Sequence, residues 1–527
     1  MKRRLPIGIQ DFVTIREDGF CYVDKTKRIH DLLTGSGKSF FLSRPRRFGK
    51  SLLCSTLGAI FEGRRELFTG LAIDSLEWDW KKHPVIRIDL NPGNYGQGVD
   101  VLFENCNRSL EFAAQKFHVS LTGDSSGDSF IRLIKALNDR YGEKVAVIID
   151  EYDKPLLNTM DDRDLHVAIR NELEGFYGVL KSTDEHLKFV FLTGVTKFSQ
   201  VSVFSDLNHL TDLTLNPCYA DLCGITQEEL ERDFAPEIED VARTTGRDRE
   251  TYLEDLRRFY NGYRFSEKPL TVYNPFDLLN HFFQEGKFLP YWFETGTPTF
   301  LIKLIENQNI DIAGLEKETV YYDDLRKYDV ADMQAVPVLY QSGYLTISGY
   351  DEELQAYSLD YPNEEVRGGF AKSLMEKYLK APDQDLRALA SALPRALYQG
   401  DIEGAMNALP PFFASIPYDI QIKQEKYFQT VVHLIFRMLG LHCQSEVKTA
   451  AGRIDTLAQT KRYVYCFEFK LGGGAGSKSS ETLAEEALRQ IDSKEYLLPW
   501  TGSGKTLIKV GVAFDSEKRN IGAWKTG

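Results

Sequence analysis

The sequence predicts a chain of the α/β class, and two observations point to it. Short apolar runs alternate with longer segments whose apolar residues recur at helical spacing, which is typical of a parallel sheet buried on both faces. Strands are expected at 40–43, 85–90, 145–150, 189–193 and 211–215, with helices at 130–140 and 164–181 among the intervals. Polar residues suited to phosphate and divalent cations follow several of these strands. We therefore expect a doubly wound parallel sheet in the first part of the chain.

Length and composition are those of an ordinary globular protein of about three domains. The chain has 527 residues, of which 43% are hydrophobic and 27% charged. No apolar segment of signal-peptide type follows Met1, and no 18-residue apolar run occurs, so we expect a cytoplasmic protein without membrane contact. Its seven scattered cysteines fit neither a disulfide framework nor a zinc site, and reduced thiols are expected.

The distribution of charge limits the classes of partner. A net charge of −13 argues against a protein that coats nucleic acid without specificity. Residues 421–527, however, contain 16 Lys and Arg and 11 Asp and Glu, a net charge of +5, which leaves −18 for the residues before them. This asymmetry permits the C-terminal part to contact a phosphate backbone.

The first candidate site is a phosphate-binding loop between the apolar run 40–42 and a helical pattern. Gly49 lets the backbone approach phosphate, Lys50 brings a positive charge to the β- and γ-phosphates, and Ser51 offers a hydroxyl to Mg²⁺. The usual pattern G-x-x-x-x-G-K-S has Arg44 in place of its first glycine. A basic turn between a strand and a helix is the alternative interpretation.

The second candidate feature is a buried strand that ends in two acids, about a hundred residues later. Asp150 is expected to hold Mg²⁺ through its water shell, and Glu151 to polarise the water that attacks the γ-phosphate. The alternative is that Asp at a strand end serves turn formation. Thr193 ends another apolar strand, where it could sense the γ-phosphate or simply close the strand. The residues expected to contact the nucleotide are Arg44, Arg46, Arg47, Phe48, Gly49, Lys50, Ser51, Asp150 and Thr193, with Arg46 or Arg47 as a conceivable cis arginine.

After residue 225 the pattern becomes mainly helical. Thr226 opens a helix with capping-box spacing. A helix at 336–343 followed by two strands, at 344–348 and 353–359, suggests a winged-helix module at roughly 300–370. Such a wing either touches DNA or packs on the nucleotide-binding domain, and we favour packing. The expected division of the chain is 1–225, 226–380, a helical linker at 381–414, and a last domain at 415–527.

The last domain carries a set of residues suited to phosphodiester hydrolysis. Strand alternation places Glu468 and Lys470 on one face, and Asp455 precedes them by the length of a β-hairpin. Asp455 and Glu468 would bind one or two Mg²⁺ ions, while Lys470 would orient water and offset charge. Glu425 on the preceding helix could complete the metal shell, and Gln490 on a later helix could contact the backbone or water. The alternative is a solvated strand edge with an ion pair.

Several motifs together resemble a known family of bacterial proteins with an AAA-ATPase-like N-terminal domain and a C-terminal PD-(D/E)xK nuclease-superfamily domain. The motifs that carry the resemblance are 22–26 (YVDKT), 44–51 (RPRRFGKS), 149–153 (IDEYD), 260–263 (YNGY), 452–455 (GRID) and 467–470 (FEFK). It covers essentially the whole chain and implies an ATPase coupled to a restriction-endonuclease-like fold. Arg44 matches this family's own loop pattern, whereas Ile454 stands where the nuclease motif has Pro.

Two functions from different classes follow. The first is an ATP-dependent or ATP-gated, Mg²⁺-dependent nuclease acting on DNA or RNA, with DNA favoured as the nucleic-acid partner. The second is a regulatory NTPase switch whose C-terminal domain binds nucleic acid or a protein partner without cleavage; a scaffold that binds ATP without turnover is weaker. AAA-like domains often form rings in which a neighbour's arginine completes each site. No such arginine is evident here, so self-association stays open.

Overall fold

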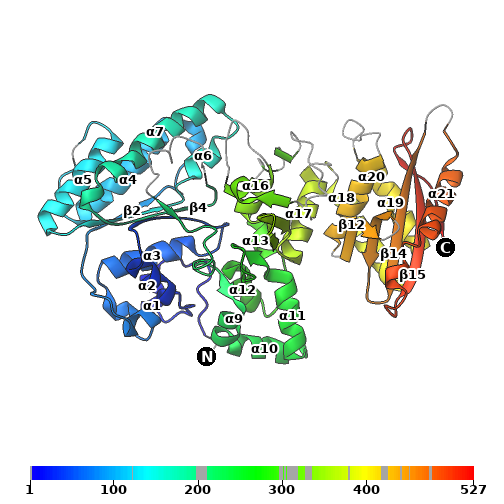
Figure 1. Cartoon of the computed structure of the whole chain (residues 1–527), viewed down its shortest axis with the longest axis horizontal. Coiled ribbons are helices and arrows are strands. Elements are labelled where there is room, and N and C mark those ends of the chain that lie inside the picture. The colour runs from blue at the N-terminus through cyan, green and yellow to red at the C-terminus, as the bar shows by residue number, and fades with distance from the viewer. Residues whose placement is uncertain are drawn as a thin grey trace. The chain divides into compact units, whose positions relative to one another are not determined.

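The computed structural model divides the chain into two compact units (Figure 1). Unit 1 comprises residues 1–296 and 318–363, and unit 2 comprises residues 297–317 and 364–527. The structure describes residues 3–121, 123–197, 210–295, 301, 304–305, 319–326, 335–377, 380, 382–416, 425–439, 442–449, 452–473 and 477–527. Unit 1 thus joins the expected nucleotide-binding domain to most of the middle region, and the finer four-part division stays a prediction.

The centre of unit 1 is a five-stranded sheet in the order β2-β3-β4-β1-β5. All neighbouring strands are parallel. The strands are β1 (Ser39–Ser43), β2 (Val85–Asp89), β3 (Val145–Asp150), β4 (Leu187–Gly194) and β5 (Thr211–Asp212). β1 and β3 are buried along their whole length, which explains their unbroken apolar runs. The predicted α/β fold is confirmed, although β5 ends at Asp212, earlier than the sequence suggested.

Helices cover both faces of this sheet (Figure 1). The helices α1, α2 and α3 lie on one face, and α4, α5 and α7 lie on the other. Their bounds are α1 (Phe12–Glu17), α2 (Thr26–Thr34), α3 (Lys50–Phe61), α4 (Val99–Lys116), α5 (Ser126–Tyr141), α6 (Lys154–Asn158) and α7 (Arg163–Ser182). Short 3₁₀ turns are η1 (Arg65–Phe68), η2 (Ala72–Ser75), η3 (Tyr95–Gln97) and η4 (Asp184–His186). The two expected helices at 130–140 and 164–181 lie within α5 and α7.

The segment before β1 is fastened to the rest of unit 1 by its Asp-Lys-Thr sequence. One Asp24 oxygen accepts hydrogen bonds from the backbone and hydroxyl of Thr26 (2.8 and 2.7 Å), and the other accepts from the Ala72 backbone N–H (2.7 Å). The Lys25 ammonium pairs with Glu229 at 2.6 Å, and both side chains are largely buried. These contacts fix the lead-in between the sheet and the helical region.

The helical region of unit 1 follows the sheet. It contains α9 (Gln227–Asp233), α10 (Ala235–Thr245), α11 (Arg249–Tyr260), α12 (Pro275–Phe283) and α13 (Tyr291–Glu294), with a small sheet of β6 (Ile225–Thr226), β7 (Tyr263–Arg264) and β8 (Thr271–Tyr273). The predicted capping box is present, because the side chains of Thr226 and Glu229 each accept a hydrogen bond from the other's backbone N–H. An apolar core that includes Phe234, Leu256 and Leu278 holds these helices together.

The expected helix and hairpin are present next to the phosphate loop. α16 (Ala335–Ser342) precedes β10 (Thr346–Asp351) and β11 (Ala356–Asp360), which pair antiparallel; α15 (Tyr322–Arg326) and a third strand, β9 (Thr319–Tyr321), complete this part. Gly343 has φ +90°, and a Cβ there would lie 2.7 Å from the Pro45 side chain. The backbone N–H of Lys197 donates to the Gln341 side chain at 2.9 Å. The end of α16 and the turn that follows it therefore pack on the nucleotide-binding domain, while the winged-helix assignment stays a prediction.

Unit 2 is a five-stranded mixed sheet with helices. The order is β12-β13-β14-β15-β16, with β14 and β15 parallel and the other pairs antiparallel. The elements are α17 (Glu364–Lys377), α18 (Asp383–Gln399), α19 (Ile402–Ser415), α20 (Glu425–Met438), β12 (His442–Thr449), β13 (Gly452–Gln459), β14 (Tyr463–Gly472), α21 (Ser480–Ser493), η6 (Leu498–Trp500), β15 (Thr506–Asp515) and β16 (Asn520–Thr526). Residues 381–414, expected as a helical linker, form α18 and α19, and Phe413 of α19 packs on Phe514 of β15; their role as a linker stays a prediction.

A close helix–strand contact positions the second candidate site. Gly511 of β15 faces α21 so closely that a Cβ would overlap the Ala484 carbonyl oxygen. Gly511 is the register partner of Glu468 on β14. α21 is therefore held directly against the strand pair that carries Glu468, and Gln490 on this helix is brought to that carboxylate.

Two expectations from composition can be compared with the structure. Six described cysteines are free thiols, of which only Cys218 is exposed. The helices of the described part of the chain include none that is both long and apolar enough to span a bilayer.

Candidate active sites

The predicted phosphate loop joins β1 to the N-terminus of α3. Gly49 has φ +89° immediately before the first helical residue, and Arg47 has φ +67°. No atom lies within 4 Å of a Cβ built on Gly49, so glycine is needed here for its backbone conformation rather than for space. This turn leaves the first N–H groups of α3, a twelve-residue helix, available to an anion.

Lys50 lies at the centre of a charged cluster. Its ammonium donates to the Pro45 carbonyl oxygen (3.2 Å) and lies 3.6 Å from a Glu151 carboxylate oxygen. The Lys50 side chain is 3% exposed and the Glu151 side chain 20% exposed. A phosphate that enters would therefore meet a cation that is already oriented and largely shielded from water.

The two acids at the end of β3 differ in environment. Burial raises the pKa of Asp150 to about 6, and the nearby Glu151 carboxylate adds to this rise, whereas the Ser51 hydrogen bond and Lys50 oppose it. Glu151 adopts φ +51°, an uncommon conformation for this residue type, and its N–H donates to Asp150 Oδ1 at 3.0 Å. The Ser51–Asp150 pair is the hydroxyl and carboxylate arrangement that a hydrated Mg²⁺ requires, so these residues fit that ion.

A cavity of about 320 Å³ opens in front of these residues. Its lining includes Arg46, Arg47, Gly49, Lys50, Ser51 and Glu151 from the predicted set, together with Asp89, Asn91 and Lys154, which sequence reasoning missed. Asp89 ends β2 and is the register partner of Asp150 on β3. A signal for it was present, because Asp89 stands near the end of the run 85–90 much as Asp150 ends the run 145–150.

Arg44 was expected to contact the nucleotide, but the structure places its side chain elsewhere. Its side chain is fully buried and donates to three backbone carbonyls, those of Ser43 (2.8 Å), Thr214 (2.9 Å) and Tyr219 (3.1 Å). The guanidinium also lies 4.1 Å from the centre of the Phe265 ring. A buried cation needs such partners, and these hold it away from the cavity. Arg44 thus supports the loop from behind.

Thr193 and Phe48 also lie away from the phosphate cavity. The Thr193 hydroxyl is fully buried and donates to the Leu42 carbonyl at 2.8 Å, which ties β4 to β1. The Phe48 ring packs edge-to-face on Tyr263, with ring centres 4.7 Å apart. The expectation of direct nucleotide contact does not match the position of Thr193, whereas Phe48 lines an apolar cavity beside the phosphate cavity.

The third acid in the motif at 149–153 stabilises the neighbouring strand end. Asp153 is fully buried and accepts hydrogen bonds from the backbone N–H groups of Val195 (3.0 Å) and Thr196 (2.6 Å) and from the Thr196 hydroxyl (2.7 Å). Burial, with Glu151 nearby, raises the pKa of Asp153, while these hydrogen bonds act in the opposite direction. Asp153 thereby fixes the turn that carries Glu151 to the end of β4.

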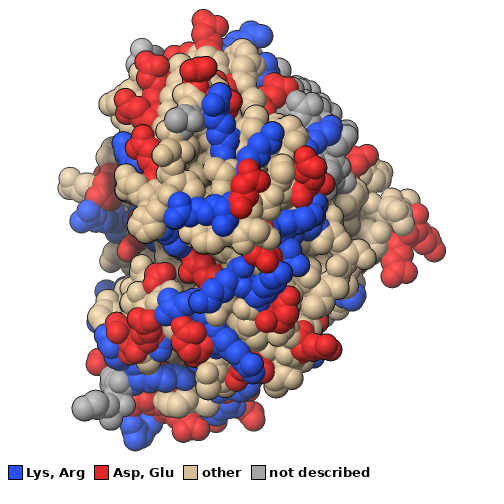
Figure 2. Space-filling view, turned by 90° about the vertical axis from the view of Figure 1, so that its left-hand side faces the viewer, with Lys and Arg blue, Asp and Glu red and all other residues tan. Residues whose placement is uncertain are grey.

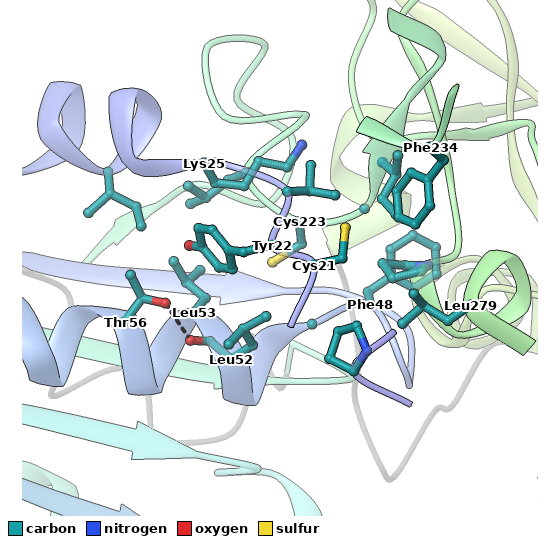
Figure 3. Close-up of a pocket in the computed structure, with 18 residues that line it drawn as sticks. Cys21, Tyr22, Lys25, Phe48, Leu52, Leu53, Thr56, Cys223, Phe234 and Leu279 are labelled. Carbon is teal, nitrogen blue, oxygen red and sulfur yellow. Dashed lines mark hydrogen bonds between the residues drawn. The ribbon is translucent and has the colours of Figure 1, made fainter. Parts of the chain in front are cut away.

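An apolar cavity of about 100 Å³ adjoins the phosphate cavity (Figure 3). The two share five lining residues: Pro6, Gly49, Leu52, Pro275 and Leu279. The close-up shows Cys21, Tyr22 and Phe48 around it, together with Leu52 and Leu53 from α3. A flat apolar group attached to a phosphate chain would fit this pair of adjoining cavities.

In unit 2, β13 and β14 form the antiparallel pair that the spacing predicted. The last paired positions are Thr456 and Phe467, so Asp455 and Glu468 follow on opposite strands. One Asp455 carboxylate oxygen accepts a hydrogen bond from the Phe469 backbone N–H at 2.8 Å. The two carboxylates are thereby brought together at this end of the strand pair.

Glu468 is the most unusual carboxylate of unit 2. It is 2% exposed; its Oε1 accepts hydrogen bonds from the Lys470 ammonium (3.4 Å) and the Gln490 amide, and its Oε2 has no partner. Burial raises the pKa of Glu468 to about 8, Asp455 adds to the rise, and Lys470 opposes it. The Gln490 amide also lies 3.3 Å from the Tyr496 hydroxyl. An unpartnered carboxylate oxygen beside a second carboxylate fits a divalent cation.

Glu425 begins α20, but its side chain lies outside the described residues. Among the described side chains no group of three or more His, Cys, Asp or Glu could hold a metal ion. The candidate metal ligands that the structure brings together in unit 2 are therefore Asp455 and Glu468, and the role of Glu425 stays a prediction.

Comparisons with known proteins identify the class. The family model described as Predicted AAA-ATPase matches residues 6–204, and the PD-(D/E)XK nuclease superfamily model matches residues 423–524. The chain belongs to the family of proteins that join these two domains, as its motifs suggested.

Two individual proteins are similar to this chain. A protein of Azotobacter chroococcum mcd 1, described as an uncharacterized protein in the vnfD 5′ region, is 37% identical over 530 residues, covering 99% of this chain and 98% of the relative. A structure of the Aeropyrum pernix ORC2 protein in ADPNP–ADP complexes is 13% identical, with a TM-score of 0.24 over 64% of this chain and 87% of that one. The latter likeness is too low to support an argument about this chain.

Proposed function

We propose that the chain binds and hydrolyses ATP in unit 1 and cleaves phosphodiester bonds of nucleic acid in unit 2, with Mg²⁺ at both sites. The observation that chiefly supports cleavage is the buried Glu468 carboxylate, whose Oε2 has no partner and which lies beside Asp455. A merely structural carboxylate at 2% exposure would be expected to have both oxygens satisfied. DNA is proposed as the substrate in preference to RNA.

In unit 1, the phosphates of ATP would lie over the N-terminus of α3. The backbone N–H groups after Gly49 would donate to them, and Lys50 would leave the Pro45 carbonyl to contact the β- and γ-phosphates. Glu151 would accept a proton from the attacking water, since it is the more exposed acid of the pair at the end of β3. Ser51 and Asp150 would hold Mg²⁺, which supplies positive charge to the phosphate oxygens. The adenine would occupy the adjoining apolar cavity.

In unit 2, Asp455 and Glu468 would hold Mg²⁺, which supplies Lewis acidity at the scissile phosphate. The Lys470 side chain is 28% exposed and can reach both Glu468 and a bound phosphodiester. Its ammonium would orient the water and offset the charge that develops on phosphate. Gln490 would keep Glu468 in one orientation through its amide hydrogen bond.

The electrostatics of the surface limit how nucleic acid could bind. On the face shown in Figure 2, Lys and Arg side chains are interspersed with Asp and Glu side chains. Such a face offers no uniform attraction to a phosphate backbone. The net positive charge of residues 421–527 instead supports unit 2 as the part that contacts the substrate.

The test is a cleavage assay on supercoiled, linear and single-stranded DNA and on RNA, with Mg²⁺ or Mn²⁺, in the presence and absence of ATP. Glu468→Gln should abolish cleavage and leave ATP hydrolysis within about twofold, because the variant keeps the shape but loses the ligand charge. Glu481→Gln, an exposed change on α21, is the matched control. Cleavage that persists in Glu468→Gln would reject the assigned site.

One observation favours a second function, a nucleotide-dependent switch without cleavage. The turn between α16 and β10 lies against the phosphate loop through Gly343 and Pro45, and Gln341 of α16 holds the Lys197 backbone near the end of β4. Movement of the loop on ATP binding would therefore reach α16 and the turn that leads into β10. Mn²⁺ binding that is the same in the wild type and Glu468→Gln, together with ATP hydrolysis and no cleavage, would favour this switch.

A further inference from the structure

Four cationic side chains line the phosphate cavity, and two of them lack a partner. Lys50 is held by Pro45 and Glu151, and the Arg47 guanidinium lies 5.1 Å from the centre of the Phe276 ring. The side chains of Arg46 and Lys154 make no hydrogen bond, ion pair or ring contact within the described part of the chain.

The backbone around both residues is fixed. The Lys154 N–H donates to the Glu151 carbonyl at 3.0 Å, so one tight turn sets the positions of these two side chains, and buried Asp153 anchors it. The Arg46 carbonyl accepts a hydrogen bond from the Trp292 indole at 3.1 Å, which holds the loop against the helical region. The two cations are therefore presented to the cavity by rigid backbone segments.

Their mutual repulsion indicates an anion as the missing partner. Burial lowers the pKa of Lys154, and the Arg46 charge lowers it further, whereas Glu151 and Asp153 act in the opposite direction. Among the described residues, neither of these two like charges has an acid as its ion-pair partner. Together they therefore destabilise the protein unless a ligand compensates them. The cavity is already assigned to the phosphates of ATP, and Lys50 and the α3 N-terminus account for the phosphates nearest the loop.

We propose that Lys154, together with Arg46, holds the terminal phosphate of ATP and supplies in cis the positive charge that stabilises its transfer to water. This inference rests on the proposed ATPase function. In the step, the water oxygen bonds to the γ-phosphorus while the bond from this phosphorus to the β–γ bridging oxygen breaks. Glu151 takes the proton from water, the electron pair of the broken bond stays on ADP, and the two cations donate to the transferring phosphoryl oxygens unchanged. Each chain would then complete its own site.

The first experiment measures nucleotide binding by the full chain and its variants. Lys154→Met should weaken binding of a non-hydrolysable ATP analogue by about tenfold or more, while ADP binding should change by less than about twofold, since ADP lacks the contacted phosphate. The turnover number should fall by about 10²–10³-fold, as for loss of one group that stabilises developing charge. Lys154→Arg should recover part of the turnover. Lys181→Met, an exposed change on α7, is the control.

Several outcomes would overturn the proposal. One is wild-type turnover by Lys154→Met; another is equal weakening of ADP and the ATP analogue, which would place Lys154 away from the terminal phosphate. Nucleotide binding by the wild-type chain is measured before any variant is made. If the wild type binds no nucleotide, the proposed ATPase function itself is rejected. Hydrolysis without the expected loss in Lys154→Met would reject the inference and leave the ATPase function standing.

The second experiment tests the cis arrangement. Turnover per chain should stay constant when the wild type is diluted about a hundredfold, because no charge from a second copy is needed. Turnover per chain that falls steeply on dilution would show that a second copy supplies the missing cation, and would overturn the cis assignment.

Discussion

The two candidate active sites use similar residues in different environments. Each combines two carboxylates with a lysine at the end of a buried strand, but Asp150 has Ser51 as a hydrogen-bond partner, whereas Glu468 keeps one oxygen without a partner. Burial raises the pKa of Asp150 to about 6 and that of Glu468 to about 8. The two acids at the end of β3 thus already have partners in the protein, with Lys50 3.6 Å from Glu151, whereas the buried Glu468 of unit 2 would depend more heavily on a bound cation.

The largest effects are expected from the two lysines. Lys50→Met should reduce ATP turnover by about 10²–10³-fold, and Lys470→Met should reduce cleavage by a similar factor, because each removes a charge that acts on a reacting phosphate. Both reactions are measured for both variants in the full chain. If Lys470→Met slows ATP hydrolysis as strongly as cleavage, the sites are not separate as the comparison requires.

The second prediction separates ATP binding from ATP hydrolysis. Glu151→Gln should slow hydrolysis by about 10²–10⁴-fold, since it removes the proton acceptor, and should keep ATP bound because the amide has the same shape. Measuring DNA cleavage in this variant shows which event gates unit 2. Undiminished cleavage means that ATP binding suffices, and lost cleavage means that turnover is needed. Glu239→Gln, an exposed change on α10, should alter neither reaction.

A smaller effect distinguishes two neighbouring arginines of the loop. Arg44→Met should lower the free energy of unfolding by about 1–3 kcal/mol, because the carbonyls of Ser43, Thr214 and Tyr219 lose a buried donor. Arg46→Met should leave stability nearly unchanged and weaken nucleotide binding instead. Thermal unfolding without nucleotide, followed by binding measurements, checks both. Equal stability of the two variants would contradict the buried role of Arg44.

The smallest effect concerns a buried histidine away from both sites. Burial lowers the pKa of His281 to about 4; its Nε2 lies 2.7 Å from the Tyr252 hydroxyl, and its Nδ1 lies 3.0 Å from the Lys287 carbonyl oxygen. The unfolded chain takes up this proton near pH 6.5, so the stabilising contribution is present above pH 6.5 and is lost as the pH falls towards 4. The loss is about 1.4 kcal/mol per unit of pKa difference.

Denaturant unfolding between pH 4 and 7 tests this effect in the wild type and in His281→Gln. The variant should show a shallower decline of stability with acid, since its side chain does not titrate. An identical decline in both proteins would mean that carboxylates alone set the acid stability of unit 1.

The accuracy of the sequence predictions depended on how local each feature was. The strands of the unit 1 sheet, the capping box at Thr226 and the placement of Asp455 and Glu468 on adjacent strands follow from residue spacing, and the structure has them. Arg44 and Thr193 lie in the loop or at a strand end beside the candidate phosphate cavity, yet their side chains point away from it, and Phe48 lines the adjoining apolar cavity instead. Motif membership gave their place along the chain but not the direction of the side chain.

By itself the sequence determined which segments form strands and helices, the order of the phosphate loop and the acids, and the hairpin spacing of the unit 2 residues. These features depend on apolar periodicity and on short-range backbone geometry, which are written in consecutive residues. Only the tertiary structure decided that Lys154 and Arg46 share one cavity, that Asp89 lies beside Asp150, and that Glu468 is buried with an unpartnered oxygen. Such features arise from strand order and packing between distant segments, and burial and charge pairing in turn set each group's pKa.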